Sequence, residues 1–143
     1  MSTKEQRIGE IVAGHAGREG PLLPILHDVQ AELGCVDAES EALIATALNL
    51  SRADVHGVVS FYHDFHDHAD PRPEVQICRA EACQARGVEA LMPSAEKAAG
   101  DRVKLTTVYC LGLCSAGPSA RVGDRLYARL DGQRLNAVIE AAR

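Results

Sequence analysis

Apolar residues recur at intervals of three and four through the first part of the chain, which is the pattern of amphipathic helices. The clearest such stripe, in residues 21–33, consists of Leu22, Ile25, Leu26, Val29 and Leu33. Gly34 follows directly and is placed to end this helix. A less regular helical pattern covers residues 4–13. The chain is therefore expected to begin with helices.

Two further helices are marked by residues that favour helix N-termini. Asp37 precedes a segment whose apolar positions include Leu43, Ile44, Ala47 and Leu48. Ser51 is followed three residues later by Asp54, which forms a capping-box sequence for a short helix through residue 59. These segments together predict a small helical bundle that ends near Phe65.

The pattern changes at residues 63–73, which are polar, rich in His and Asp, and end in Pro71 and Pro73. Such a composition predicts a linker. Residues 74–77 then alternate strictly between polar and apolar, which predicts a strand with one buried face. Helical spacing returns over the next apolar set, Ala85, Val88, Leu91, Met92 and Ala95.

The remaining segments complete an α/β unit. A second strand is expected at residues 103–109, and a hairpin of two short strands, 120–122 and 126–130, turns at Gly123 and Asp124. A last helix has Leu135, Val138, Ile139 and Ala142 on one face. Strand, helix, strand, hairpin and helix is the order of a thioredoxin-like domain with a right-handed crossover. The predicted fold class is α/β, with a helical bundle in residues 1–70 followed by a thioredoxin-like α/β domain in residues 71–143.

Composition limits the classes of function. The chain has 143 residues, of which 46% are hydrophobic, enough for a core that needs no disulfides. Lys plus Arg number 15 against 20 for Asp plus Glu, so clustered cations for nucleic acid or an anionic membrane are absent from the sequence. No apolar stretch approaches the roughly 18 residues of a membrane span. A cytoplasmic protein is expected, and no nucleophile elbow or phosphate-binding glycine loop indicates a hydrolase.

Four of the five cysteines form two pairs, Cys78 with Cys83 and Cys110 with Cys114. In a chain that is not exported, cysteines are more often metal ligands or redox groups than disulfides. Each pair begins where a predicted strand ends. Adjacent strand ends bring both loops to the same edge of the sheet, so four thiolates can converge on one site.

Two kinds of metal site suit four thiolates, tetrahedral zinc and an iron-sulfur cluster. Structural zinc sites commonly have two residues between paired cysteines, and neither pair here has that spacing. A binuclear cluster needs two ligands for each iron, and longer loops provide them. Gly112 allows a close backbone approach, while Leu111 and Leu113 can shield the site. These features favour a [2Fe-2S] cluster over zinc, and the two-residue spacing of a redox-active dithiol is absent.

Residues near the pairs have two interpretations each. Arg79 and Glu81 either both point to solvent, where their opposite charges cancel, or the Glu81 carboxylate opposes reduction of a nearby anionic cluster. Pro118 after Gly117 is either a cis proline, as thioredoxin-like folds often have, or a plain turn proline. Cys35 is expected to be an inert small core residue.

The histidines His56, His63, His66 and His68 also suggest a metal site. Because three of them lie in the predicted polar linker, solvation or contact with a partner is the favoured interpretation, and no metal is assigned to them.

The cysteine motifs resemble those of a known family. Cys78-x4-Cys83, followed by Cys110-Leu-Gly-Leu-Cys114 and Pro118, is similar to the thioredoxin-like [2Fe-2S] ferredoxin family, to which the 24-kDa-type subunit of respiratory NADH dehydrogenase belongs. The plant-type ferredoxin pattern is different.

The resemblance extends over nearly the whole chain. Residues 23–27 and 55–62 are similar to the N-terminal bundle of the same subunit. Within the family, residues 78–84 and 109–114 look most like the gamma subunit of soluble, NAD-dependent, molybdenum-containing formate dehydrogenase.

The resemblance implies an electron-transfer subunit with no catalytic residues and no site for NAD or formate. It implies one [2Fe-2S] cluster whose ligands are Cys78, Cys83, Cys110 and Cys114. It also implies a partner flavoprotein that binds FMN and NAD, and through it a molybdenum-containing subunit, with the helical half binding the flavoprotein. The alternatives are the equivalent subunit of NADH dehydrogenase or an NAD-linked hydrogenase, or a zinc-stabilised assembly module. An uncovered apolar partner surface would favour a homodimer of the isolated chain, which the sequence leaves open.

Overall fold

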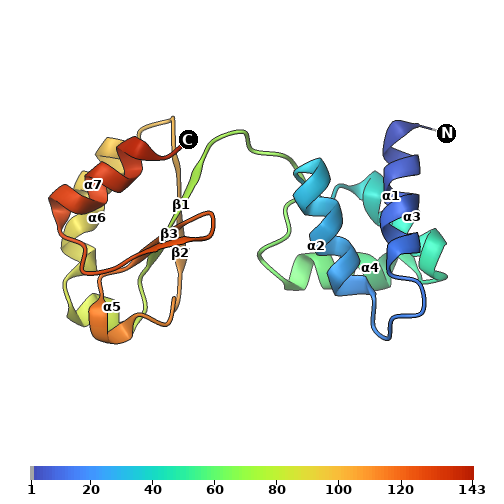
Figure 1. The fold of residues 1–143 in the computed structure, drawn as a ribbon, viewed down its shortest axis with the longest axis horizontal. Coiled ribbons are helices and arrows are strands. Elements are labelled where there is room, and N and C mark those ends of the chain that lie inside the picture. Colours follow the sequence, from blue (N-terminus) through green and yellow to red (C-terminus); the bar gives the residue numbers. More distant parts are fainter. Residues whose placement is uncertain (1) are drawn as a thin grey trace. The chain divides into compact units, whose positions relative to one another are not determined.

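The computed structural model describes residues 2–143 and divides into two compact units, one ending at Asp70 and the other beginning at Pro71 (Figure 1). The described part of the first unit contains four α-helices, and the second contains a four-stranded sheet with helices. The predicted α/β fold class is confirmed. None of the helices in residues 2–143 combines the length and the apolar character that a bilayer crossing requires.

The four helices of the first unit begin at side-chain caps or turns that the sequence provides. They are α1 (Thr3–Gly14), α2 (Leu22–Leu33), α3 (Ala38–Leu48) and α4 (Arg52–Phe61). Asp37 accepts a hydrogen bond from the Ser40 amide at the start of α3, and the predicted capping box of Ser51 and Asp54 is present at the start of α4. Gly34 ends α2 with φ of 82°, a left-handed conformation that glycine adopts without a steric penalty.

The core of the first unit is formed where the predicted apolar stripes meet. Its fully buried members are Ile8, Ile25, Leu26, Val29, Val36, Ile44 and Val55. Phe65 joins them with 7% of its surface exposed, so the packed unit continues past the end of α4. Burial of side chains of this size contributes about 1.5 to 3 kcal/mol each, which is the main stabilisation of the bundle.

Part of the predicted linker is instead fixed to the helical unit. Both the amide and the carbonyl of His66 are hydrogen-bonded, at 2.7 Å, to the Gln30 side chain and to the Val36 amide. The Gln30 amide group also donates to the Asp64 carbonyl. These bonds satisfy backbone groups that a free linker would leave to water, so the histidine segment belongs to the bundle.

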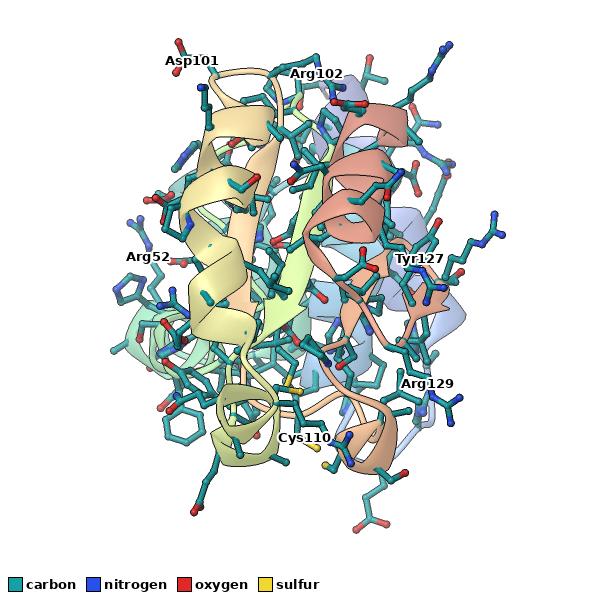
Figure 2. All side chains as sticks on the ribbon, turned by 90° about the vertical axis from the view of Figure 1, so that its left-hand side faces the viewer. Arg52, Asp101, Arg102, Cys110, Tyr127 and Arg129 are labelled. Carbon is teal, nitrogen blue, oxygen red and sulfur yellow. The ribbon has the colours of Figure 1, made fainter. Side chains whose placement is uncertain are left out.

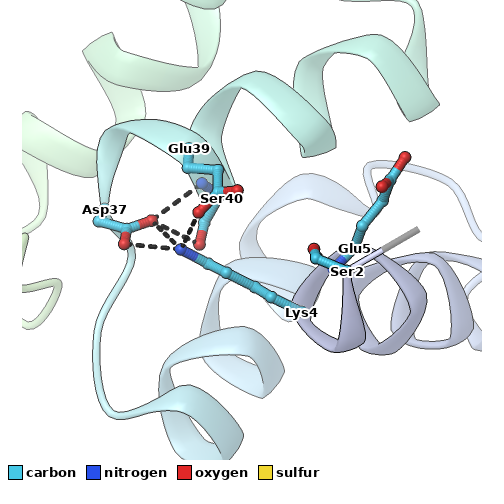
Figure 3. Close-up of polar contacts among 6 residues, drawn as sticks. All are labelled: Ser2, Lys4, Glu5, Asp37, Glu39 and Ser40. Atoms are coloured by element: carbon cyan, nitrogen blue, oxygen red, sulfur yellow. Dashed lines mark hydrogen bonds and ion pairs between the residues drawn. The ribbon is translucent and has the colours of Figure 1, made fainter.

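A charged contact joins the first helix to the third (Figure 3). The Lys4 ammonium lies 2.7 and 2.6 Å from the two carboxylate oxygens of Asp37 and 2.9 Å from Glu39. The hydrogen bond from Lys4, followed by that from the Ser40 amide, lowers the pKa of Asp37 to about 2. Asp37 therefore caps α3 and pairs with α1 at the same time.

We expect Asp37→Asn to destabilise the protein near neutral pH but not in acid. Asparagine still caps the helix, so the change removes mainly the charge. Because the folded pKa lies below the unfolded value, the stabilisation is present above pH of about 4 and is lost as the pH falls to about 2. The side chain is 37% exposed. After allowance for solvent screening the loss is about 1 kcal/mol.

Urea unfolding at about pH 6 and about pH 2 measures this difference. Lys4→Met, which removes the partner charge, should reproduce the loss near neutral pH. An equal difference between wild type and Asp37→Asn at both pH values would contradict the assignment.

The second unit is a mixed sheet with its two longest helices on one face (Figure 1). Its elements are β1 (Glu74–Cys78), α5 (Glu81–Ala85), α6 (Val88–Ala99), β2 (Lys104–Val108), the 3-10 helix η1 (Cys114–Ala116), β3 (Ala120–Val122), β4 (Arg125–Tyr127) and α7 (Gly132–Ala141). The strand order is β2-β1-β3-β4, with β1 and β2 parallel and the other pairs antiparallel. The register aligns Cys78, the last residue of β1, with Val108, the last residue of β2.

The core of this unit lies between the sheet and helices α6 and α7. Val75 and Ile77 are buried on β1 while Glu74 and Gln76 are only partly covered, as the alternation predicts. The helices contribute the buried residues Val88, Met92, Ala95, Leu135 and Ile139. This core fixes the ends of the two parallel strands from which the cysteine loops leave.

Two predicted elements differ in the structure. The helix expected to run from Ala85 to Ala95 is two helices, because Gly87 adopts φ of 92° between α5 and α6. The apolar periodicity continues across this break, so spacing alone does not reveal it. The last strand ends at Tyr127 instead of Leu130, because Arg129 has φ of 51° and the Leu130 amide bonds to the Pro118 carbonyl.

Candidate metal centre

The two cysteine pairs lie at one edge of the sheet of the second unit. Cys78 ends β1 and Cys83 lies in α5, and both are buried, with 2% and 1% of their surface exposed. Cys110 follows β2 and Cys114 begins the 3-10 helix, and both are exposed. Figure 2 shows Cys110 beyond the strand ends, at the end of the unit opposite Asp101 and Arg102. The parallel pairing of β1 and β2 places both loops at this edge.

Contacts between the two loops place the two cysteine pairs near each other. The Cys78 sulfur accepts hydrogen bonds from the backbone amide of Ala80 in its own loop and from those of Leu111 and Cys110 in the other. Cys78 and Cys83 are hydrogen-bonded to each other. The charge of Cys83 also contributes to raising the pKa of Cys114. The two loops therefore meet at one edge of the sheet, as the strand order predicts, and the four-cysteine ligand set stays a prediction.

The spacing within the exposed pair matches that of two ligands of one metal ion. The sulfur atoms of Cys110 and Cys114 are 3.6 Å apart. Two sulfurs at about 2.3 Å from one tetrahedral metal are about 3.8 Å apart. Within residues 2–143, no three His, Cys, Asp or Glu side chains are grouped around a single metal position. The cysteines of the exposed loop are thus spaced as a pair, and no third ligand is grouped with them in the described residues.

The thiols influence one another's deprotonation. Burial raises the pKa of Cys78, but the amides that donate to its sulfur and the Cys83 thiol bring that pKa below the usual value. Burial, and then the neighbouring Cys78, raise the pKa of Cys83. The hydrogen bond and charge of Cys110 raise the pKa of Cys114. Loss of the second proton from each pair is therefore resisted, and a bound cation would relieve that repulsion.

Backbone amides at the site suit an anionic metal-thiolate group. Besides those on Cys78, the Gly112 amide lies 3.3 Å from the Cys110 sulfur, and Gly112 has φ of 77°. Leu111, which is half-buried, packs against the core beside the site. Amide donors stabilise negative charge on sulfur, and apolar cover limits access of water.

Three residues that contact the cysteines were not singled out by the sequence pattern for that role. The Gly117 backbone approaches Cys83 so closely that a Cβ at Gly117 would lie 2.9 Å from the Cys83 sulfur. The buried Ser119 hydroxyl is 3.8 Å from the same sulfur. Arg86 donates to the Cys114 carbonyl at 3.2 Å. The only sequence signal was the Gly117-Pro118 pair, whose peptide bond is cis.

The other candidate residues belong to the helical unit or have partners other than the cysteines. Cys35, expected in the core, is only half-buried and belongs to the helical unit. The four histidines at 56, 63, 66 and 68 are also in the helical unit. Arg79 does not simply point to solvent, because its guanidinium makes two hydrogen bonds, of 2.8 and 2.6 Å, to Glu89.

Comparison with known proteins identifies the family. The description "Thioredoxin-like [2Fe-2S] ferredoxin" matches residues 8–143. The chain belongs to the thioredoxin-like [2Fe-2S] ferredoxin family. A member of this family contains one [2Fe-2S] cluster, so the family match favours the cluster over the zinc alternative.

Proteins from two kinds of oxidoreductase complex are similar over most of this chain. A subunit of the NADH-quinone oxidoreductase of Rhizobium meliloti (strain 1021) is 31% identical over 99% of this chain and 89% of its own length. The NADP-reducing hydrogenase subunit HndA of Solidesulfovibrio fructosivorans is 27% identical over 79% of this chain and 71% of its own.

A solved structure has the same fold. The crystal structure of NAD+-reducing [NiFe]-hydrogenase in the air-oxidized state contains a chain that superposes with a TM-score of 0.70 and 28% identity. The match covers 84% of this chain but only 22% of the hydrogenase chain, so this protein corresponds to about a fifth of that polypeptide.

We expect Glu81→Gln to raise the reduction potential of the loaded protein. Glu81 begins α5 between Cys78 and Cys83, so its carboxylate adds negative charge where a further negative charge arrives on reduction. An exposed charge of this kind contributes about 0.2 to 1 kcal/mol, which corresponds to roughly 10 to 40 mV for one electron. An EPR-monitored redox titration measures the shift. Glu96→Gln on α6 serves as a control, and an unchanged or lower potential in Glu81→Gln would contradict the expectation.

Proposed function

We propose that this chain is the electron-transfer subunit of an NAD-linked oxidoreductase complex, with Cys78, Cys83, Cys110 and Cys114 as the ligands of its [2Fe-2S] cluster. When bound, the cluster supplies a centre that accepts and releases one electron at a time. The observation that supports this ligand set is the pairwise arrangement of the thiols at one sheet edge, with backbone amides directed at the sulfurs.

The chain's own residues perform three tasks in this proposal. The cysteine sulfurs bind the irons. The amides of Ala80, Leu111 and Gly112 stabilise the negative charge of the thiolates. The buried pair and the half-buried Leu111 keep water from the inner side, while the exposed pair leaves the other side close to the surface. A short path from the surface to the cluster is what electron exchange with a partner protein needs.

The partner in this proposal is a flavoprotein that binds FMN and NAD. The names of the relatives support it, since they are subunits of NADH-quinone oxidoreductase and of NADP-reducing hydrogenase. The proposed role of this chain is to exchange single electrons with the flavin, and the chain itself binds neither NAD nor the organic substrate.

Within this class we propose a soluble NAD-dependent formate dehydrogenase, with a molybdenum-containing subunit beyond the flavoprotein. The support is the resemblance of residues 78–84 and 109–114 to the gamma subunit of that enzyme. NADH dehydrogenase and NAD-linked hydrogenase are the alternatives, and they are the kinds of complex to which the similar proteins belong.

Spectroscopy of the purified chain tests the cofactor and the ligand chemistry. We expect sulfur-to-iron absorption bands in the visible range and, after dithionite reduction, an S = 1/2 EPR signal. Metal analysis should give iron and acid-labile sulfide in equal amounts. A colourless, EPR-silent protein with one tightly bound zinc ion would leave the fold intact and refute the function.

Purification of the native complex tests the finer assignment. The chain is tagged in its host, and the copurified subunits are identified by mass spectrometry. Molybdenum in the complex and formate-dependent reduction of NAD are expected. A complex that contains nickel, or one that reduces quinone with NADH and lacks molybdenum, would favour one of the two alternatives.

A truncation tests the proposed role of the helical unit in partner binding. Because residues 71–143 contain their own core and all four paired cysteines, this fragment should remain coloured. It should no longer copurify with the flavoprotein. Retention of the flavoprotein by the fragment would assign partner binding to the thioredoxin-like unit instead.

A further inference from the structure

The helical unit contains a second candidate site, a cavity lined by acidic, histidine and aromatic residues. It has a volume of about 390 Å³ and is lined by residues of α3, α4 and the segment that follows α4. Two of the lining residues, Glu41 and Asp67, are acidic, and neither Lys nor Arg occurs in the described lining. The lining also contains four histidines, and one of them, His68, lies 2.6 Å from Asp67. With His counted as neutral, the lining carries two negative charges and no positive charge.

Glu41 is the buried charge of this cavity. Its side chain is only 11% exposed, and both of its carboxylate oxygens lie 3.1 Å from one atom, Nδ1 of His56. One ring nitrogen offers at most one proton, whereas a carboxylate accepts about four hydrogen bonds. A buried carboxylate is costly unless it is paired and fully hydrogen-bonded. Glu41 therefore has acceptor capacity that a cationic group entering the cavity can fill.

Two aromatic residues, Tyr62 and Phe65, also line this cavity. The Tyr62 ring lines the cavity and is 43% exposed, and the buried Phe65 ring meets it edge to face at 6.4 Å between centroids. Phe61 contacts Tyr62 in the same manner at 5.0 Å and is 74% exposed. A planar guanidinium stacks on aromatic faces and donates two parallel hydrogen bonds to a carboxylate, whereas an ammonium acts as a point charge.

The segment of the lining that follows α4 is held in place by hydrogen bonds within the helical unit. Gln30 and Val36 hold the backbone of residues 64–66 through the three hydrogen bonds described above. A preformed site loses less conformational entropy on binding, which favours affinity.

We propose that this cavity receives an arginine side chain of the flavoprotein partner, with the guanidinium paired to Glu41 and stacked on Tyr62. The proposal rests on the proposed function, since it assigns a contact to that same complex. It places a specific anchor in the helical unit and gives a role to the Glu41 carboxylate and the Tyr62 ring of the cavity.

The chemistry of the cavity is tested on the full-length chain by NMR. ¹H–¹⁵N spectra are recorded during titration with N-acetyl-arginine methylamide, and with the uncharged N-acetyl-norleucine methylamide as the matched probe. We expect shifts confined to the lining residues with the arginine amide alone. Glu41→Gln should weaken this binding at least about tenfold. Glu19→Gln, which removes an equal charge from an exposed position of the same unit, should have no effect.

Tyr62→Leu provides a second variant at a half-exposed position, in case Glu41→Gln disturbs folding. It should weaken binding several-fold through loss of stacking. An equal response to the norleucine amide, or binding unchanged in both variants, would overturn the proposal.

Copurification separates this proposal from the proposed function. If the native complex contains the flavoprotein and Glu41→Gln retains it as firmly as Glu19→Gln in a salt wash, the docking proposal fails while the function stands. If no flavoprotein copurifies with wild type, the proposed function fails, and the NMR titration still decides whether the cavity binds a guanidinium.

Discussion

Cys114→Ala is expected to yield a colourless protein with a folded thioredoxin-like unit. Cys114 is exposed and begins a short 3-10 helix, so its removal costs the core little. In the proposed ligand set, loss of Cys114 leaves one iron with a single protein thiolate, so we expect the cluster to be lost. We expect the iron and sulfide content to fall below about a tenth of that of wild type.

Visible absorption, EPR after reduction and circular dichroism measure this result together. The matched control is Cys35→Ala, because Cys35 lies in the helical unit and should leave the cluster intact. Cys83→Ala should be as colourless as Cys114→Ala but less stable, since Cys83 is buried. Full retention of colour in Cys114→Ala would remove this residue from the ligand set.

Gly117→Ala is expected to impair cluster assembly without replacing any of the proposed ligands. A Cβ at this position would lie 2.9 Å from the Cys83 sulfur and 3.3 Å from Cδ of Arg86. The flexible Arg86 side chain can move aside, but the Cys83 sulfur is one bond from its own Cβ and is buried, so it can move away only by rotation of the Cys83 side chain. Overpacking of this kind typically costs about 1 to 3 kcal/mol. We expect a several-fold lower cluster content.

Gly132→Ala is the matched control for this effect. Its Cβ would meet only Leu91, at an ordinary distance of 4.0 Å, and it begins a helix where alanine is favourable. Iron content and thermal unfolding of both variants are compared with wild type. Wild-type cluster content in Gly117→Ala would show that the sulfur of Cys83 is free to move away.

The placement of both cysteine loops at one sheet edge could be predicted from the sequence because local pattern and simple geometry coincide there. Each pair follows a strand whose alternation or apolar content is visible, and parallel neighbouring strands end at one edge. The same reasoning could not find Gly117 or Ser119, since their contacts with Cys83 arise when a distant loop folds back onto α5. No periodicity encodes such a contact.

In the helical unit, too, local features could be predicted from the sequence and tertiary contacts could not. The caps at Asp37 and Ser51 were predicted because they depend on residues three positions apart. The attachment of the histidine segment depends on Gln30, one polar residue on α2 with no distinguishing pattern around it. The composition of that segment indicated a linker, and only the tertiary hydrogen bonds assign it to the bundle.

The difference in burial between the two cysteine pairs has a consequence for the protein before it receives its cluster. The inner sulfurs of Cys78 and Cys83 are covered, whereas those of Cys110 and Cys114 face solvent 3.6 Å apart. In the proposed ligand set, we therefore expect an incoming cluster donor to meet the outer pair first. An oxidant would reach the same outer pair, and a disulfide formed there would remove half of the proposed ligands at once. We thus expect this protein to need a reducing environment until the cluster is inserted.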